Sequence, residues 1–262
     1  MYVDLLLWGW LGVAAMMLAL WSYQWVKQDA SAVDVGWATC LGCLSVFYAL
    51  MGPGTSSRRI LIAFLAGFWA FRLASYLLLD RIVHGDEDRR YRRLRAHWGG
   101  AAHRNFFFFY QAQGLLGVVL SLPFLLICFN AVPQMHPLEI AAVGLWLVAI
   151  IGESVADRQL ASFRANPDNR GLTCRSGLWR YSRHPNYFFE WLIWCAYALM
   201  ALPAPYGWAG LASPVIMLIL ILKVTGVPPS EEQAMASRGD DYRDYQQTTS
   251  VFLPWFPKRR ST

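Results

Sequence analysis

Long apolar runs constrain this chain more than any other feature. A transmembrane helix needs about 20 mostly apolar residues. Only 15% of the 262 residues are charged, whereas soluble domains carry about 25%. We therefore predict an all-α membrane protein with seven transmembrane helices, built as a single domain over residues 1–262. The runs cover residues 3–26, 32–51, 60–79, 108–130, 138–156, 187–202 and 209–224.

The basic residues predict how these helices cross the membrane. Seven arginines lie within 80–107, six within 157–186, and five basic residues follow position 224. Seven spans place these three segments on one face, and the opposite face receives only Arg58 and Arg59. Loops rich in Lys and Arg stay cytosolic. We therefore expect the N-terminus outside and the C-terminus in the cytosol.

Composition also bears on two other kinds of partner. The formal net charge is +6, but nucleic-acid binding needs a basic face on a soluble fold, and these arginines lie between apolar runs. No nucleic-acid partner is expected, and the charge favours an anionic ligand. Cys40 and Cys43 have CxxC spacing, but no second pair completes a zinc site. We interpret them as small buried hydrophobes and expect no metal.

The third apolar run places polar side chains on one helical face. Trp69, Arg72, Tyr76 and Asp80 follow one another at spacings of three, four and four residues, which is helical periodicity. Ionisable residues inside a span usually face a bundle interior or a cavity. Two interpretations stay open: the stripe lines a ligand cavity, or Arg72 contacts Tyr76 or Asp80 and closes the bundle.

The fifth run ends in two carboxylates one turn apart, Glu153 and Asp157. Like charges at this spacing repel each other on a helix, so a cation or a ligand hydroxyl is expected nearby. In a structural interpretation, arginines of the loops neutralise the two carboxylates. In a functional interpretation, the hydroxyls of an adenosine or ribose group hydrogen-bond to them.

The segment 177–190, with the sequence GLWRYSRHPNYFFE, is the most informative. Pro185 fits the first turn of a helix, so the sixth span is expected to begin there, and a helix start attracts anions. Arginines that only snorkel to the membrane surface at the helix start would explain Arg180 and Arg183, but not Asn186 and Glu190 inside the helix. The pattern predicts a site for a phosphate-bearing, hydroxyl-rich ligand. Its basic and polar members are Arg180, Arg183, His184, Asn186 and Glu190.

Asp34 opens the second run and has two interpretations. An acidic residue in the first helical turn complements the helix dipole, with Ser31 as the N-cap. Alternatively, Asp34 is a carboxyl group that an apolar cavity keeps protonated, so that it donates a hydrogen bond to substrate. After residue 224, prolines and aromatics such as Phe252 and Trp255 predict a tail that returns to the interface and covers a cytosolic pocket.

At these residues the chain resembles the steroid 5-alpha-reductase family, in particular bacterial members with a conserved domain of unknown function. The block Arg-His-Pro-Asn-Tyr at 183–187 is the most specific element, and membrane methyltransferases of the isoprenylcysteine carboxyl type share a shorter version. The elements run in order over nearly the whole chain: Asp34 to Trp37, Arg72 to Asp80, Gln113 with Ser121-Leu-Pro123, Gly177 to Glu190, and Asp241 to Pro254.

The resemblance implies NADPH bound on the cytosolic side of a bacterial inner membrane, and hydride transfer to the β-carbon of an enone in a steroid-like lipid. Membrane lipid surrounds the chain, and no protein partner is expected. Most of the cofactor site is expected within 138–262. Together with the patterns above, the resemblance gives this cofactor-binding set: Arg72, Asp80, Glu153, Asp157, Arg164, Arg170, Arg175, Tyr181, His184, Asn186 and Glu190.

Asp34 and Tyr76 are the expected catalytic residues. A protonated Asp34 would polarise the ketone oxygen, an interaction typically worth several kcal/mol, with Tyr76 or Tyr187 as alternative donors. The animal enzymes of this family have a Gln-Glu pair and a Tyr where this chain has Val33-Asp34 and Trp69. Two other classes stay open: a methyltransferase that uses S-adenosylmethionine, and a non-catalytic lipid-binding membrane protein. The arginines between 158 and 183 favour a cofactor with several phosphates.

Overall fold

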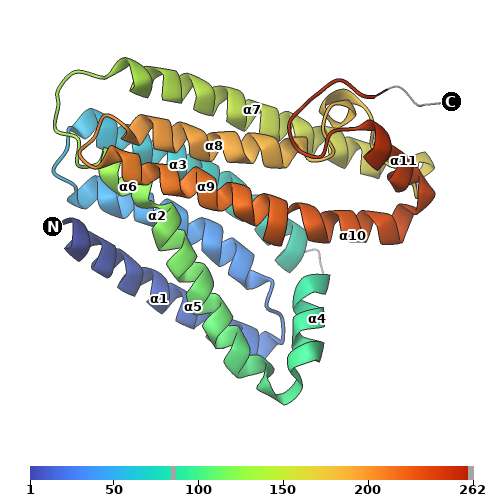
Figure 1. Cartoon of the computed structure of the whole chain (residues 1–262). Helices are drawn as coiled ribbons and strands as arrows, with labels where there is room; N and C mark the ends of the chain where they lie inside the picture. Colours follow the sequence, from blue (N-terminus) through green and yellow to red (C-terminus); the bar gives the residue numbers. More distant parts are fainter. Residues whose placement is uncertain (84–86, 259–262) are drawn as a thin grey trace. The chain divides into compact units, whose positions relative to one another are not determined.

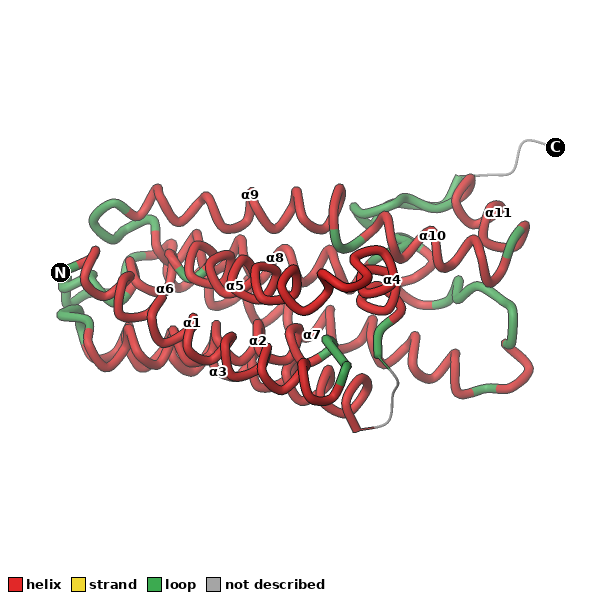
Figure 2. The backbone as a smooth tube through the Cα atoms, turned by 90° about the horizontal axis from the view of Figure 1, so that it is seen from below, coloured by secondary structure: helices red, strands yellow, loops and turns green. Residues whose placement is uncertain are grey.

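The computed structural model describes residues 1–83 and 87–258, without the side chains of residues 80, 81 and 83. This part of the chain consists of helices and loops and contains no strand (Figure 2). Its apolar helices confirm the all-α membrane class. Six helical stretches of the described residues are long and apolar enough to cross a membrane: Tyr2–Lys27, Ala32–Met51, Ser56–Leu77, Arg89–Ile127, Pro137–Ala165 and Gly207–Arg238.

The helices form two compact units, coloured along the sequence in Figure 1. Unit 1 comprises Met1–Met135 and Ala201–Gly210. Unit 2 comprises His136–Met200 and Leu211–Thr262. Every predicted cofactor residue except Arg72 and Asp80 lies in unit 2.

Unit 1 is built from helices that pack in pairs. α2 packs mainly against α3, and α1 packs against α5 and α2 (Figure 1). The close approach of α2 and α3 requires Gly42, where a Cβ atom would lie 2.9 Å from the Cβ of Ala70. The helices of the unit are α1 (Tyr2–Lys27), α2 (Ala32–Met51), α3 (Ser56–Leu77), α4 (Arg89–Trp98), α5 (Ala102–Leu120) and α6 (Leu122–Ile127).

Two predicted spans of unit 1 differ from simple α-helices. The third continues beyond Leu77 as a π-helix, Leu78–Val83. The fourth is broken at Ser121 into α5 and α6. Pro123 explains this break, because a proline lacks the backbone N–H that would continue the ladder and its ring clashes with the preceding turn. The Ser121 hydroxyl donates to the carbonyl of Val118 at 2.8 Å beside the break.

Unit 2 begins with a well-capped helix. The His136 side chain accepts a hydrogen bond from the Leu138 N–H at 3.2 Å, and Glu139 accepts one from the His136 N–H at 2.7 Å. Such reciprocal bonds satisfy N–H groups that a helix start leaves open. The helices are α7 (Pro137–Ala165), α8 (Pro185–Ala201), α9 (Ala212–Ile219), α10 (Val227–Arg238) and α11 (Asp240–Thr248), with a π-helix (Leu220–Val224) between α9 and α10.

The sixth predicted span forms α8, which begins at Pro185 as the sequence indicates. It is apolar but has only 17 residues, so it rises about 25 Å. Helices α7 and α8 pack closely. The indole N–H of Trp146 on α7 donates to the hydroxyl of Tyr197 on α8 at 3.0 Å, and both rings are buried.

Candidate functional site

Polar side chains of α7 and α8 meet near the start of α8. The side-chain amide of Asn186 donates to the Asp157 carboxylate at 3.3 Å. The helices come this close because Gly152 has no side chain: a Cβ atom there would lie 2.4 Å from the Phe189 ring. Asp157 and Asn186, which lie 29 positions apart, are thus brought together as one polar pair.

Asn186 keeps one hydrogen-bonding position open. Its side-chain oxygen is buried and has no hydrogen-bond partner among the described residues. Buried polar atoms in native proteins nearly always find a partner, and an amide oxygen accepts only from donors. A ligand hydroxyl or a water molecule would satisfy it. This unpartnered oxygen fits the hydroxyl-rich ligand that the sequence predicts.

The two glutamates lie on the same pair of helices. Glu190 on α8 accepts a hydrogen bond from the indole of Trp194 at 3.0 Å, which fixes its carboxylate. Glu153 on α7 lies one turn before Asp157 and is buried. The carboxylates of Glu153, Asp157 and Glu190 therefore belong to the packed part of unit 2 rather than to a solvated surface.

Two basic residues before α8, Arg183 and His184, form hydrogen bonds with other side chains of unit 2. Arg183 donates to one oxygen of Glu231 at 2.7 Å, and the His184 ring lies 3.2 Å from the same oxygen. Tyr242 also donates to this oxygen at 3.3 Å, and Gln246 donates to the other at 2.8 Å. Glu231 thereby ties the start of α8 to α10 and α11. This corrects the expectation that His184 belongs to an open anion site, because its partner is a carboxylate of the chain.

Arg175 has a similar structural role. It forms ion pairs with Asp244 at 2.7 Å and with Asp241 at 2.9 Å, and Asp241 also accepts the backbone N–H of Thr173 at 2.7 Å. These contacts hold α11 against the loop after α7. The expectation that Arg175 is available to a cofactor phosphate is corrected for the same reason.

Other arginines of unit 2 remain open to a ligand. Arg164 and Arg170 are exposed and have no ion-pair partner among the described residues. Arg164 also lies near enough to Arg238, at the end of α10, for the two charges to repel each other. An anion bound beside this pair would relieve the repulsion.

Two tyrosines of α11 act as fixed donors. Burial raises the pKa of Tyr242, and the charge of Glu231 raises it further. Burial likewise raises the pKa of Tyr245, whose hydroxyl donates to the carbonyls of Ser182, at 3.1 Å, and Trp179. Both phenols stay protonated at neutral pH, so Tyr242 holds α11 against Glu231 of α10 and Tyr245 holds α11 against the segment before α8.

Asp34 in unit 1 has partners that the sequence did not reveal. Its carboxylate accepts from Arg90 at 3.1 Å and from the Tyr91 hydroxyl at 2.7 Å, both on α4. An arginine partner favours an ionised carboxylate, which corrects the expectation of a protonated donor. Ser31 holds the N-cap position without a capping bond, and its hydroxyl accepts the Asp88 N–H at 2.9 Å. No pattern in the arginine-rich segment distinguishes Tyr91 beforehand.

The stripe on the third span is less uniform than predicted. Trp69 is fully buried and packs edge-on against Trp37, with ring centroids 6.1 Å apart. Arg72 is half-buried, whereas Tyr76 is 55% exposed. The side chain of Asp80 lies outside the described residues, and its backbone belongs to the π-helix, where α-helical spacing no longer applies. The four residues therefore do not form one buried α-helical face, and the catalytic role of Tyr76 stays a prediction.

Comparisons with known proteins place the chain in a family. A family model described as "Protein of unknown function (DUF1295)" matches residues 20–249, most of the chain. The chain belongs to the DUF1295 family. It is also similar to the protein of Schizosaccharomyces pombe named Uncharacterized protein C594.04c, with 26% identity over 269 residues that cover 90% of this chain and 75% of that protein. No solved structure matches the chain.

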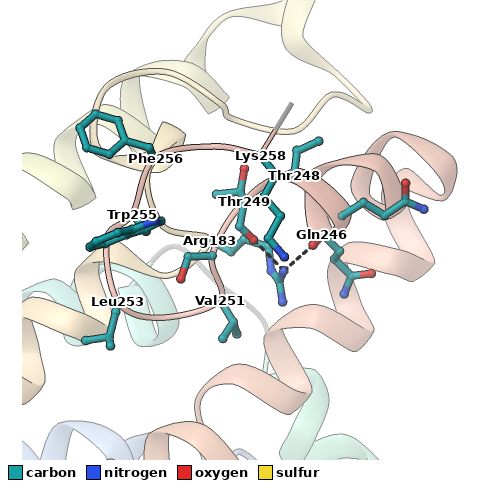
Figure 3. A pocket seen from close by; sticks show the side chains of 11 residues that line it. Arg183, Gln246, Thr248, Thr249, Val251, Leu253, Trp255, Phe256 and Lys258 are labelled. Carbon is teal, nitrogen blue, oxygen red and sulfur yellow. Dashed lines mark hydrogen bonds between the residues drawn. The ribbon is translucent and has the colours of Figure 1, made fainter. Parts of the chain in front are cut away.

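The tail of this DUF1295 protein returns to the start of α8, as the sequence predicts. The Ser182 hydroxyl donates to the carbonyl of Phe252 at 2.8 Å, the Arg183 N–H donates to that of Ser250 at 2.8 Å, and the Trp255 N–H donates to that of Tyr181 at 2.9 Å. Tyr181 is 36% exposed and packs edge-on against Phe256, with ring centroids 6.0 Å apart. The tail lines an open cavity of about 480 Å³ (Figure 3).

Proposed function

We propose that this DUF1295 protein is an NADPH-dependent membrane reductase of the steroid 5-alpha-reductase type. Its substrate would be a steroid-like lipid with a carbon–carbon double bond conjugated to a ketone. The observation that carries the proposal is the Asp157–Asn186 pair, whose buried amide oxygen requires a donor. The resemblance of residues 183–187 to that family supports the same assignment.

The residues of unit 2 suit the two chemical parts of NADPH. Ribose hydroxyls are both donors and acceptors, so they match an amide oxygen beside carboxylates such as Asp157 and Glu190. Phosphates match guanidinium groups, which bind them with two parallel hydrogen bonds. Arg164, Arg170 and Arg238 form no ion pair among the described residues, and we assign these arginines to the phosphates.

When bound, NADPH would supply a hydride to the β-carbon of the enone and become NADP⁺, and a proton from water would complete the reduction at the α-carbon. The chain's own part is to orient the cofactor and to polarise the ketone oxygen with a hydrogen-bond donor. With Asp34 held as a carboxylate, Tyr187 is the donor that we favour. Its ring stacks on His184 with centroids 5.3 Å apart, and its hydroxyl lies 2.9 Å from that of Ser230. These contacts hold the phenol of Tyr187 in one position.

For the membrane we propose seven spans, with α8 as the sixth. The short helix α8 would be accommodated by local thinning of the bilayer, which costs only fractions of a kcal/mol per Å. An odd number of spans puts the basic segments on the cytosolic face of a bacterial inner membrane, where NADPH is available, and leaves the N-terminus outside.

Substitution of the polar pair tests the cofactor site. Asn186→Ala and Asp157→Ala should each weaken NADPH binding roughly tenfold, the equivalent of about one hydrogen bond to a charged or buried partner. Isothermal calorimetry on the detergent-purified full chain measures this. Gln233→Ala removes an exposed amide from α10 and is the matched control. Wild-type affinity in both folded variants would remove the basis of the proposal.

A further inference from the structure

The cavity beside the tail does not include Asp157 or Asn186, and its lining has a different chemistry. It is lined by hydroxyl groups of Thr248, Thr249 and Ser250 and by two cations, Arg183 and Lys258 (Figure 3). Arg183 is already paired with Glu231. Lys258 is exposed and has no ion-pair partner among the described residues. The Thr248 hydroxyl already donates to the carbonyl of Asp244 at 3.1 Å, so the cavity offers one available positive charge beside the Ser250 hydroxyl.

A second hollow adds to the positive charge beside the tail. It has a volume of about 280 Å³, shares Thr248 and Thr249 with the first, and is lined by Arg180. Arg180 is exposed, and no described carboxylate pairs with it. The tail is thus flanked by Lys258 on one cavity and Arg180 on the other.

Apolar side chains of the tail point outward instead of into a core. Leu253 is 59% exposed, Trp255 71% and Phe256 76%. Phe252 is the exception: it is buried and packs against Phe188 and Trp191 of α8, with ring centroids 5.7 and 5.9 Å away. This packing fixes the tail beside the first two turns of an apolar helix. The exposed rings therefore lie at the depth where an apolar helix enters the headgroup layer, a region that favours Trp and other aromatics.

We propose that the cavity beside the tail is a binding site for the headgroup of an anionic phospholipid. Lys258 attracts the headgroup phosphate, and the Ser250 hydroxyl hydrogen-bonds to it. Leu253, Trp255 and Phe256 contact the upper part of the acyl chains. Charge selects this occupant, because the available side chains are cationic and anionic lipids concentrate near basic residues at a membrane surface. Lys258 and the exposed apolar residues of the site lie after residue 249, where the match to the DUF1295 model ends.

Intact-protein mass spectrometry of the delipidated full chain tests the site, with phosphatidylglycerol and phosphatidylcholine of identical acyl chains as probes. Phosphatidylglycerol should bind more tightly. Lys258→Ala should weaken its binding roughly fivefold, the equivalent of about 1 kcal/mol per basic residue, and should leave phosphatidylcholine unchanged. Trp255→Ser should weaken both lipids, because it removes apolar contact.

Arg243→Ala is the matched control, because Arg243 is an exposed cation of α11 that does not line the cavity. It should retain wild-type lipid binding. Equal affinity for both lipids would overturn the proposal, and so would soluble glycerol phosphate that binds as tightly as phosphatidylglycerol. NADPH affinity is measured on the same variants and should not change. A loss of NADPH affinity in Lys258→Ala would instead assign the cavity to the cofactor.

Discussion

At the scale of single residues, Glu231 connects three parts of unit 2: the segment before α8, α10 and α11. It accepts from Arg183, Tyr242 and Gln246 and contacts His184. Glu231→Ala should lower the free energy of unfolding by about 3 kcal/mol, because it leaves a largely buried guanidinium without its carboxylate. Thermal melting in detergent measures the effect. Glu231→Gln, which keeps an acceptor, should lose less, and a wild-type melting temperature for Glu231→Ala would contradict this role.

Arg164 carries a prediction about cofactor preference. It is exposed beside Arg238 without a carboxylate partner among the described residues. Arg164→Ala should weaken NADPH roughly tenfold while NADH changes less, because only NADPH has the additional phosphate. Competition binding with both nucleotides measures the ratio. Arg243→Ala, again on an exposed cation, should leave the ratio unchanged, and an equal loss for both nucleotides would reassign Arg164 to the shared phosphates.

The sequence singled out Asp157 and Asn186 separately, but it predicted neither their contact nor the partners of the arginines. Asn186 and Asp157 were recognisable because each belongs to an apolar helix, where a polar side chain is energetically costly and usually has a function. The use of Arg175, by contrast, depends on carboxylates 66 and 69 positions away. Helical periodicity relates neighbours within one element, so it gives no information on such pairs. The same limit hid the pairing of Asp34 with Tyr91.

At the scale of helices, the contact between α7 and α8 positions the polar pair, and Gly152 permits it. A methyl group at this position would lie 2.4 Å from the Phe189 ring. Gly152→Ala should therefore destabilise the chain by about 1–3 kcal/mol and weaken NADPH binding together with it. Gly144→Ala on the same helix meets nothing within 4 Å and should be neutral or slightly stabilising. Equal melting temperatures for the two variants would show that the close approach is unimportant.

Helix boundaries were predictable where a residue dictates them. Pro185 starts α8 because proline fits a first turn, and the second span matches α2 at both ends. The π-helical turns after α3 and α9 were not predictable, because the apolar pattern continues through them. The break at Ser121 had a signal in Pro123, but the length of the apolar run concealed it.

At the scale of the whole molecule, the distribution of arginines predicts an odd number of spans. Reporter fusions at the two ends should place the C-terminus in the cytosol and the N-terminus outside, because the three basic segments must share the cytosolic face. An even number of spans, with both ends on one side, would contradict the proposed topology. If α8 did not cross, the basic residues after position 224 would lie on the face opposite to those before α8.

Ligand preference tests the central claim most directly. Purified wild-type protein should be stabilised against heat by NADPH, less by NADH, and not by S-adenosylmethionine, since only the nucleotides bring phosphates to the arginines of unit 2. Stabilisation by S-adenosylmethionine alone would contradict the reductase and indicate a membrane methyltransferase. If none of the three stabilised the protein, both enzyme assignments would be contradicted, and a lipid-binding membrane protein would remain as the interpretation.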